Sequence, residues 1–468
     1  MKDASTRATS MSSRARALLT LSLFAACAAP TEQTVKHIPE KPNIVLVVID
    51  DMGWTDLGCQ GSSYYESPNI DRLASEGVRF TDAYSSGPNC SPSRAALLTG
   101  NYPSRTGVTT VLNKKVNEFA LKEHPRRKSL STEETTFAEV LRGAGYKSIS
   151  IGKWHLGKDK HAEDPLGQGF DENVGGNHNG HPGSYHHPFG KGAGRVPVDA
   201  PEGSYLTDVL TDRALDFVRR NQDEPFCLYL PYYSVHTPIQ PRADLMAKYE
   251  AKEPVGGHKN PGYAAMIEAV DEGVGRILAL LDELELREDT LVIVTSDNGG
   301  HSVTSNAPLR GRKGMLYEGG LRVPLIVRLP GVTEPGTICA EPTLSMDVFP
   351  TLAKLAGAAS TEAVDGADLM PLFAGEEHLE RDAIFWHFPH YLVGRQTPAS
   401  AVRMGDWKLI ETFETGQIEL YDLANDIGET KDSVSKHPGL ASALHGRLRA
   451  WRDDIGAKIP VPNPDWEG

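Results

Sequence analysis

The sequence predicts an α/β protein, with a large and mostly parallel sheet sandwiched by helices and a smaller C-terminal α+β subdomain carrying an antiparallel sheet. The first indication is the continuous apolar run at 43–49 (Asn-Ile-Val-Leu-Val-Val-Ile), which is typical of a strand buried on both faces. The second is that such runs alternate with helical segments, and strand–helix–strand units build parallel sheets. The third is a change of pattern after about residue 375. We therefore expect a main domain over 41–375 and the subdomain over 376–468.

The individual elements follow from local signals. Pro68 and Gly77 bracket a helix over 68–78, because proline suits the first helical turn and glycine the end. The stretch from 157 to 203 is rich in Gly, His and Pro and predicts a long ordered loop. Further strands are expected at 146–151, 225–230, 290–295 and 323–327, and further helices at 135–143, 206–220 and 261–286. In the subdomain, we expect antiparallel strands at 401–413 and 417–421 and a closing helix at 438–455.

The N-terminus has the pattern of a secretory signal over residues 1–27. Basic residues precede a short apolar run from Ala17 to Ala26, and this run is too short to span a bilayer. Cys27 directly after small residues resembles a bacterial lipoprotein signal, which implies that Cys27 is lipidated. Residues 28–40 then form a polar tether. We expect an exported protein, periplasmic or at the cell surface, with a lipid anchor to the membrane.

The overall charge argues against nucleic acid as a partner. The chain of 468 residues has 48 basic and 62 acidic residues, a formal net charge of −14 and a pI near 5.6. General nucleic-acid binding needs a basic face. An anionic substrate would have to be held by local positive groups against the overall field.

Charged or polar residues directly follow several of the expected strands. Any one of these strand ends could be a solvated loop. In open α/β sheets, however, ligands bind beyond the carboxyl ends of the strands, so the recurrence predicts a shared site. The residues concerned are Asp50 and Asp51, Lys153 and His155, His236, and Asp297 with Asn298.

The converging aspartates predict a metal ion. Two unit charges about 4 Å apart repel by about 4 kcal/mol at an effective dielectric of 20, so the group needs a cation or protonation. Oxygen ligands favour a hard cation, calcium first and magnesium second, over zinc. Asp50 and Asp51 can both bind only if the strand has already turned, because neighbouring strand residues point to opposite faces. Gly53 is compatible with such a turn.

The stretch from 87 to 100 predicts a loop that leads into a short helix. Pro92 suits an early helical position, and Gly100 supplies a stop. Cys90 would then lie at the positive end of the helix with Arg94 about one turn further on, where an anion or a nucleophile is favoured. A small apolar cysteine at an ordinary junction is the alternative interpretation.

Several motifs resemble the type I sulfatase family. Cys-Ser-Pro-Ser-Arg at 90–94 with Leu-Thr-Gly at 98–100 matches its first signature, and Gly-Lys-Trp-His-Leu-Gly at 152–157 matches the second. Four further matches occur in the order found in that family: the Asp50-Asp51 pair, Val-His-Thr-Pro at 235–238, Ser-Asp-Asn-Gly at 296–299 and Gly-Arg-Lys-Gly at 311–314. The resemblance covers about residues 42–430 and implies an alkaline-phosphatase-like core.

The resemblance also implies a role for each site residue. Cys90 would be converted by a formylglycine-generating maturation enzyme, and the formylglycine hydrate would be the nucleophile, with Arg94 stabilising its surroundings. Lys153 and Lys313 would hold sulfate oxygens. His236 would assist the leaving ester oxygen, and His155 would hydrogen-bond the hydrate. One Ca²⁺ would be bound by Asp50, Asp51, Cys90, Asp297 and Asn298.

We therefore expect a calcium-dependent sulfatase that removes sulfate from a sulfated carbohydrate, with exo action on a galactose or N-acetylgalactosamine sulfate favoured. Two alternatives stay open at this point. The first is a phosphoesterase or phosphonate hydrolase on the same scaffold. The second is a non-catalytic lipoprotein that binds anionic glycans. The sequence does not name the sugar or the sulfated position.

Overall fold

The computed structural model describes residues 39–112, 119–158, 162–358 and 363–467. The predicted signal peptide, Cys27 and the tether up to residue 38 lie outside these ranges, so their prediction is not addressed by the fold. No helix within the described ranges combines the length and the apolar character that crossing a membrane requires.

Eight strands of the described chain form the main sheet. Its order is β10 (Thr337–Cys339), β2 (Val78–Phe80), β9 (Leu325–Arg328), β8 (Thr290–Ser296), β1 (Asn43–Ile49), β7 (Phe226–Pro231), β5 (Lys147–Ile151) and β6 (Glu172–Val174). Neighbours are parallel except that β9 runs antiparallel to both β8 and β2. The predicted mostly parallel α/β sheet is confirmed, with β1 at its centre.

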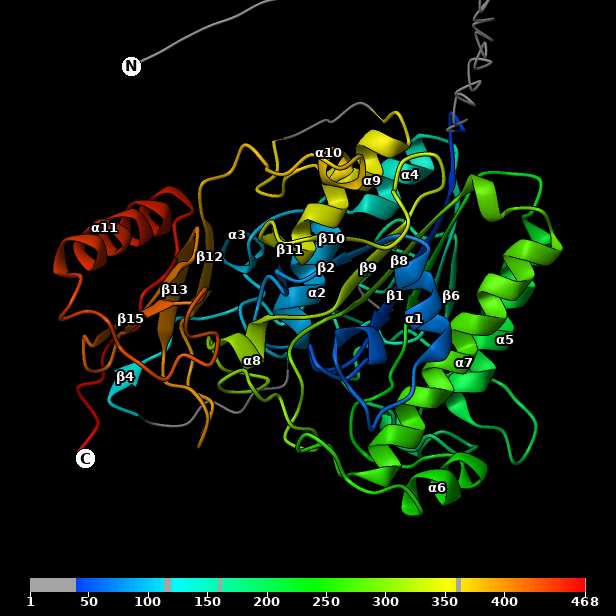
Figure 1. Ribbon diagram of the computed structural model, residues 1–468, viewed down its shortest axis with the longest axis horizontal. Helices are drawn as coiled ribbons and strands as arrows, with labels where there is room; N and C mark the ends of the chain where they lie inside the picture. Colours follow the sequence, from blue (N-terminus) through cyan, green and yellow to red (C-terminus); the bar gives the residue numbers. More distant parts are fainter. Residues whose placement is uncertain (1–38, 113–118, 159–161, 359–362, 468) are drawn as a thin grey trace, which may run out of the picture. The chain divides into compact units, whose positions relative to one another are not determined.

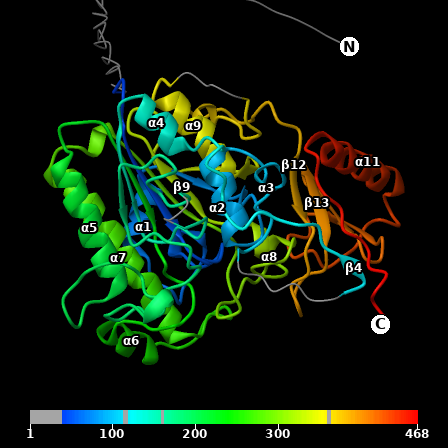
Figure 2. The ribbon, with the colours of Figure 1, turned by 180° about the vertical axis from the view of Figure 1, so that it is seen from behind.

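Helices cover both faces of this sheet (Figures 1 and 2). Alternate residues of β1 point to opposite faces: Val45, Val47 and Ile49 belong to one apolar cluster and Ile44, Leu46 and Val48 to another. The first cluster includes side chains of α1 (Pro68–Ser75), α5 (Leu206–Arg220) and α7 (Pro261–Glu283). The second includes side chains of α2 (Cys90–Thr99), α4 (Phe137–Gly143) and α9 (Val348–Leu355). A strand buried on both faces explains why β1 reads as an unbroken apolar run.

Shorter elements connect these layers. The helices are α3 (Pro103–Thr106), α6 (Ala243–Glu250), α8 (Glu318–Leu321) and α10 (Met370–Phe373), and the 3₁₀ turns are η1 (Gly58–Gln60), η3 (Gly192–Gly194), η4 (Arg287–Asp289) and η5 (Ser345–Asp347). Two small ladders pair β3 (Ala83–Tyr84) with β11 (Thr343–Leu344) and β4 (Leu121–Lys122) with β16 (Val461–Pro462). The helix expected over 68–78 ends at Ser75, and β6 lies within the predicted long loop of 157–203.

The C-terminal part forms an antiparallel sheet of β12 (Ile384–Phe388), β13 (Ala399–Met404), β14 (Trp407–Thr412) and β15 (Ile418–Asp422), followed by α11 (Pro438–Asp454). The predicted single strand over 401–413 is wrong: it is the hairpin β13–β14. Gly405, at φ 55°, and Asp406 turn the chain there.

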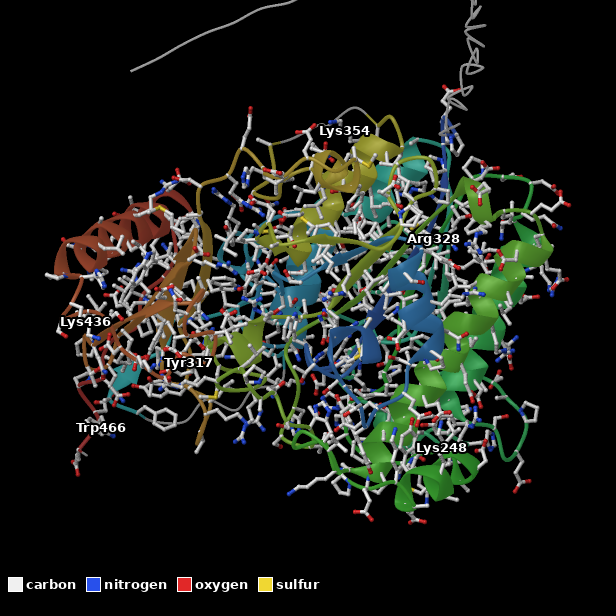
Figure 3. The ribbon with its side chains drawn as sticks, viewed as in Figure 1. Lys248, Tyr317, Arg328, Lys354, Lys436 and Trp466 are labelled. Carbon is white, nitrogen blue, oxygen red and sulfur yellow. The ribbon has the colours of Figure 1, made fainter. Side chains whose placement is uncertain are left out.

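This sheet is joined to the main domain by buried polar contacts around α8. Lys408 of β14 forms ion pairs with Glu318 at 2.8 Å and with Glu429 at 2.9 Å, and all three side chains are fully buried. Tyr317, labelled in Figure 3, donates its hydroxyl to Glu419 of β15 at 2.7 Å. These contacts between α8 and the C-terminal sheet therefore fix the chain segment that directly follows Lys313.

Candidate active site

The carboxyl ends of the central strands remain linked by backbone hydrogen bonds beyond the sheet itself. The amide of Asp50 donates to Ser234 O at 2.9 Å, and that of Lys153 donates to Pro231 O at 2.7 Å. On the other side of β1, the amide of Asp297 donates to Ile49 O at 3.2 Å. These contacts fix the chain segments after β1, β5, β7 and β8 side by side, so their side chains converge.

The aspartate pair after β1 is arranged as a turn. Asp51 has φ 64°, a left-handed conformation that aspartate tolerates better than most residues, and it reorients the chain after Asp50. The amide of Asp51 donates to Asp297 Oδ1 at 3.2 Å. One ligand atom each from Asp50, Asp51, Cys90 and Asp297 lies within 4.8 Å of the others, and all four residues are buried. Both aspartates therefore face the same point, as the expected turn requires.

The oxygen atoms of this cluster fit a hard cation. Asp51 Oδ2 and Asn298 Oδ1 are buried and have no hydrogen-bond partner. The Asn298 amide nitrogen donates to Asp51 Oδ1 at 2.8 Å, which leaves its oxygen free for another ligand. Burial, with added repulsion from Asp297 and Asp51, raises the pKa of Asp50 to about 8. Residues that hold converging, unsatisfied oxygens in this way fit the predicted Ca²⁺.

Three buried cations border the carboxylates. Lys153 Nζ lies 2.6 Å from Asp50 Oδ2, and Lys313 Nζ lies 2.5 Å from Asp51 Oδ1. The Arg94 guanidinium contacts Asp297 Oδ2 at 2.8 Å. Arg94 is held in place by α2, whose ten residues are all buried. The positive groups thus lie within the fold rather than on flexible surface side chains.

Cys90 is the first residue of α2. Asn89 before it is extended, and Gly100, at φ 71°, ends the helix, as the sequence predicted. The Cys90 sulfur lies 3.1 Å from Lys313 Nζ and 3.6 Å from Asp50 Oδ1. Burial raises the pKa of the thiol to about 12, although Lys153 and Lys313 act to lower it. The unmodified thiol therefore stays protonated at neutral pH and is a weak nucleophile.

Two histidines complete the predicted set. His236 Nδ1 lies 2.7 Å from the carbonyl of Thr237, so Nδ1 carries the proton and Nε2, 3.6 Å from Asp51 Oδ2, faces the site. Burial lowers the pKa of His236 to about 3 and also lowers that of His155. The His155 carbonyl accepts a hydrogen bond from Ser91 in α2 at 3.1 Å. Both imidazoles are neutral.

The structure brings together all ten residues predicted from the sequence. It also places three residues there that sequence reasoning missed. The Tyr185 hydroxyl contacts the carbonyls of Tyr233 and His236, at 2.6 and 2.8 Å. The His301 ring lies 6.5 Å from that of His236, and Arg395 Nη2 lies 3.4 Å from His301 Nε2. His301 lies two residues after the Ser-Asp-Asn-Gly segment and is the one of these three with a local signal.

The sheet, the acidic turn and the helix that begins at Cys90 define an alkaline-phosphatase-like hydrolase. A family model described as Sulfatase matches residues 42–358, and one described as N-sulphoglucosamine sulphohydrolase, C-terminal, matches residues 312–454. The chain therefore belongs to the sulfatase family and is a sulfuric ester hydrolase. The predicted family, fold class and enzyme class are confirmed, whereas the roles of single residues remain predictions.

Individual relatives are similar over most of the chain. A sulfatase of Formosa agariphila is 34% identical, with 93% of this chain and 95% of that protein covered. The N-acetylgalactosamine-6-sulfatase of Canis lupus familiaris is 35% identical, with 90% and 82% covered. The crystal structure of Ps i-CgsB in complex with k-i-k-neocarrahexaose has a TM-score of 0.76 and 31% identity, with 91% and 95% covered. A phosphonate monoester hydrolase of Agrobacterium radiobacter, at a TM-score of 0.65 and 22% identity, shares the fold.

Proposed function

We propose that this sulfatase removes sulfate from a sulfated glycan, with a galactose or N-acetylgalactosamine sulfate as the favoured unit and Cys90 matured to formylglycine. The observation that carries the proposal is the buried cluster of three aspartates, Asn298 and Cys90 bordered by three cations. The sugar class rests on the N-acetylgalactosamine-6-sulfatase relatives and on the k-i-k-neocarrahexaose named in the complex of Ps i-CgsB.

The charge balance of the cluster supports an anionic ester as the substrate. With Asp50, Asp51 and Asp297 all ionised, as a bound cation would keep them, the three carboxylates are matched by the three cations Arg94, Lys153 and Lys313. One Ca²⁺ held by the aspartates and Asn298 would supply positive charge that binds and polarises sulfate oxygens. The loaded site would then be net positive inside a chain of charge −14.

Each residue then has a defined task. Lys153 and Lys313 neutralise sulfate oxygens. His236, whose Nδ1 donates to the Thr237 carbonyl, presents Nε2 toward the leaving ester oxygen. Nε2 must first take up a proton, so the doubly protonated imidazolium is the form that would donate this proton to the leaving group. A formylglycine hydrate at position 90 would supply an oxygen nucleophile with a second hydroxyl for resetting the site. The weakness of the buried thiol is consistent with the need for this modification and hence for a maturation enzyme in the host.

The test is a sulfate-release screen over defined sulfated oligosaccharides. Active protein is expected to show formylglycine in the peptide spanning residues 87–105 by mass spectrometry, and Cys90→Ala is expected to abolish release while leaving the fold intact. Fully active protein with only unmodified cysteine would overturn the mechanism. Parallel assays with phosphate and phosphonate esters address the alternative hydrolase, which a strong preference for those esters would support. Calcium-dependent glycan binding without release by modified protein would support the non-catalytic alternative.

We further propose export with lipidation of Cys27. The support is the sequence pattern alone. Metabolic labelling with a radioactive fatty acid in a bacterial host should mark the wild-type chain and leave Cys27→Ala unlabelled. Equal labelling of the two chains would contradict the proposal.

A further inference from the structure

Two arginines beside the active site have no carboxylate partner among the described residues, unlike Arg322 and Arg381. Arg322 pairs with Glu318 at 2.7 Å and Arg381 with Asp347 at 2.7 Å. In contrast, Arg312 and Arg395 form no ion pair with any carboxylate of the described residues, although both are half-buried. The Nε of Arg312 is buried without a hydrogen-bond partner. In a chain with 62 acidic residues, this absence of a counter-charge calls for an explanation.

These arginines lie close to the reacting centre. Arg312 directly precedes Lys313, whose amine contacts Cys90. Arg395 comes from the loop between β12 and β13, and this loop lies against the Lys313 segment: a Cβ on Gly314 would lie 3.8 Å from Arg395 Cδ. The amide of Leu316 also donates to Gln396 Oε1 at 3.1 Å. The loop between β12 and β13 therefore places the Arg395 guanidinium next to that of Arg312.

His301 connects the pair to the active site. Its Nε2 accepts from Arg395 Nη2 at 3.4 Å, and its Nδ1 lies 3.1 Å from the Ser302 hydroxyl. Its ring is 6.5 Å from the ring of His236. Burial, together with the charges of Lys313, Arg395 and Arg312, lowers the pKa of His301, so this imidazole is neutral and does not satisfy the arginines electrostatically.

The two guanidiniums repel each other in a partly desolvated place. Desolvation and the charge of Arg312 lower the pKa of Arg395. Like charges in such a position are unfavourable unless an anion lies between them. Planar guanidiniums bind the oxygens of sulfate or carboxylate with two parallel hydrogen bonds, so an anion of that shape would relieve the repulsion.

We propose that Arg312 and Arg395 form a subsite for a second anionic group of the substrate, a sulfate or a carboxylate on the same sugar or its neighbour. The inference rests on the proposed function, because it assumes a glycan whose target sulfate lies at the Cys90 site. It sharpens the substrate class to a glycan with two closely spaced anionic groups. Arg395 is in this way a specificity determinant contributed by the C-terminal sheet.

The experiment compares matched oligosaccharides that carry the same target sulfate. The first oligosaccharide carries no other charge near the target sulfate. The second carries a second sulfate at the neighbouring position, and the third carries a uronate carboxylate there. For Arg395→Gln and for Arg312→Gln, kcat/KM on a two-anion substrate relative to the one-anion substrate is expected to fall about 10–100-fold, the value of a charged hydrogen bond. The sulfate and uronate arms identify which anion is bound. Arg449→Gln, on the exposed side of α11, removes the same charge and should leave the ratio unchanged.

An unchanged ratio in both subsite variants, or equal losses on one-anion and two-anion substrates, would overturn the proposal. Failure of the proposed function gives a different result, since wild-type protein would then release sulfate from none of the glycans. In that event, calorimetric binding of the same oligosaccharides to the full-length Cys90→Ala chain decides the matter. Preference for two anions that is lost in Cys90→Ala/Arg395→Gln supports the subsite, and a preference that persists rejects it.

Discussion

The side-chain amide of Asn298 controls the geometry of the acidic cluster. Its nitrogen donates to Asp51 Oδ1 and to Gly299 O, at 2.8 and 3.1 Å, and its buried oxygen has no hydrogen-bond partner and is left to bind a cation. We predict that Asn298→Ala weakens Ca²⁺ binding about 10–100-fold, because both a ligand and its orienting contact are lost. The measurement is a Ca²⁺ titration of chelator-treated protein followed by thermal unfolding, since a bound ion stabilises the folded state. The exposed Asn425→Ala is the control, and a titration midpoint equal to that of wild type would contradict the assignment.

The hydroxyl of Tyr185 supports the segment that carries His236. It bridges the buried carbonyl of Tyr233 and the carbonyl of His236. Tyr185→Phe leaves these acceptors without that donor, and we expect the free energy of unfolding to fall by about 1–3 kcal/mol, with a loss of kcat. Tyr205→Phe is a matched control, because it removes a buried tyrosine hydroxyl that bonds to neither of these carbonyls. Equal stability of the two variants in urea denaturation would show that the bridge does not hold this segment.

At the scale of elements, α8 and β14 are joined by the buried ion pairs of Lys408. Removing the ammonium would leave Glu318 and Glu429 buried without their main counter-charge. We therefore predict that Lys408→Met lowers the free energy of unfolding by about 3–5 kcal/mol. The exposed Lys436→Met, whose position is labelled in Figure 3, should change it by less than about 0.5 kcal/mol. Urea denaturation measures both, and a loss below 1 kcal/mol for Lys408→Met would mean that the joint contributes little.

The elements that sequence reasoning predicted well are those whose burial is uniform. Strand β1 was predicted at the correct residues because burial on both faces leaves an unbroken apolar pattern. The sequence predicts one strand in place of the hairpin β13–β14, because the turn at Gly405 and Asp406 is short and interrupts otherwise continuous strand-forming residues. The short β6 is not predicted because its three residues are half-buried and only Val174 is apolar, which gives too weak a hydrophobic pattern.

At the scale of the whole molecule, the site residues that directly follow strands can be predicted from the sequence. The site residues that lie on loops cannot be predicted in this way. Asp50, Lys153 and Asp297 directly follow strands that share one sheet edge, so their convergence follows from topology. Arg395 and Tyr185 reach the site from loops whose positions depend on tertiary packing. No periodicity in the sequence indicates that contact, and the pairing of Arg395 with His301 appears only once the C-terminal sheet is docked.

That docking leads to a prediction for the chain as a unit. One apolar cluster combines residues of the main domain with the C-terminal sheet and α11; its buried members from the main domain are Tyr84, Ala96, Tyr102, Leu316, Leu321, Leu344 and Met346. A fragment of residues 39–375 would expose these side chains and lose the contacts that hold the Lys313 segment, and marginally stable folds do not tolerate such a loss. We expect the fragment to show no cooperative thermal transition by circular dichroism and no sulfate release, in contrast to residues 39–468. Co-expression with residues 376–468 should restore both signals. If the fragment alone unfolded cooperatively within about 4 °C of the longer chain, the C-terminal sheet would be an independent addition rather than part of the active fold.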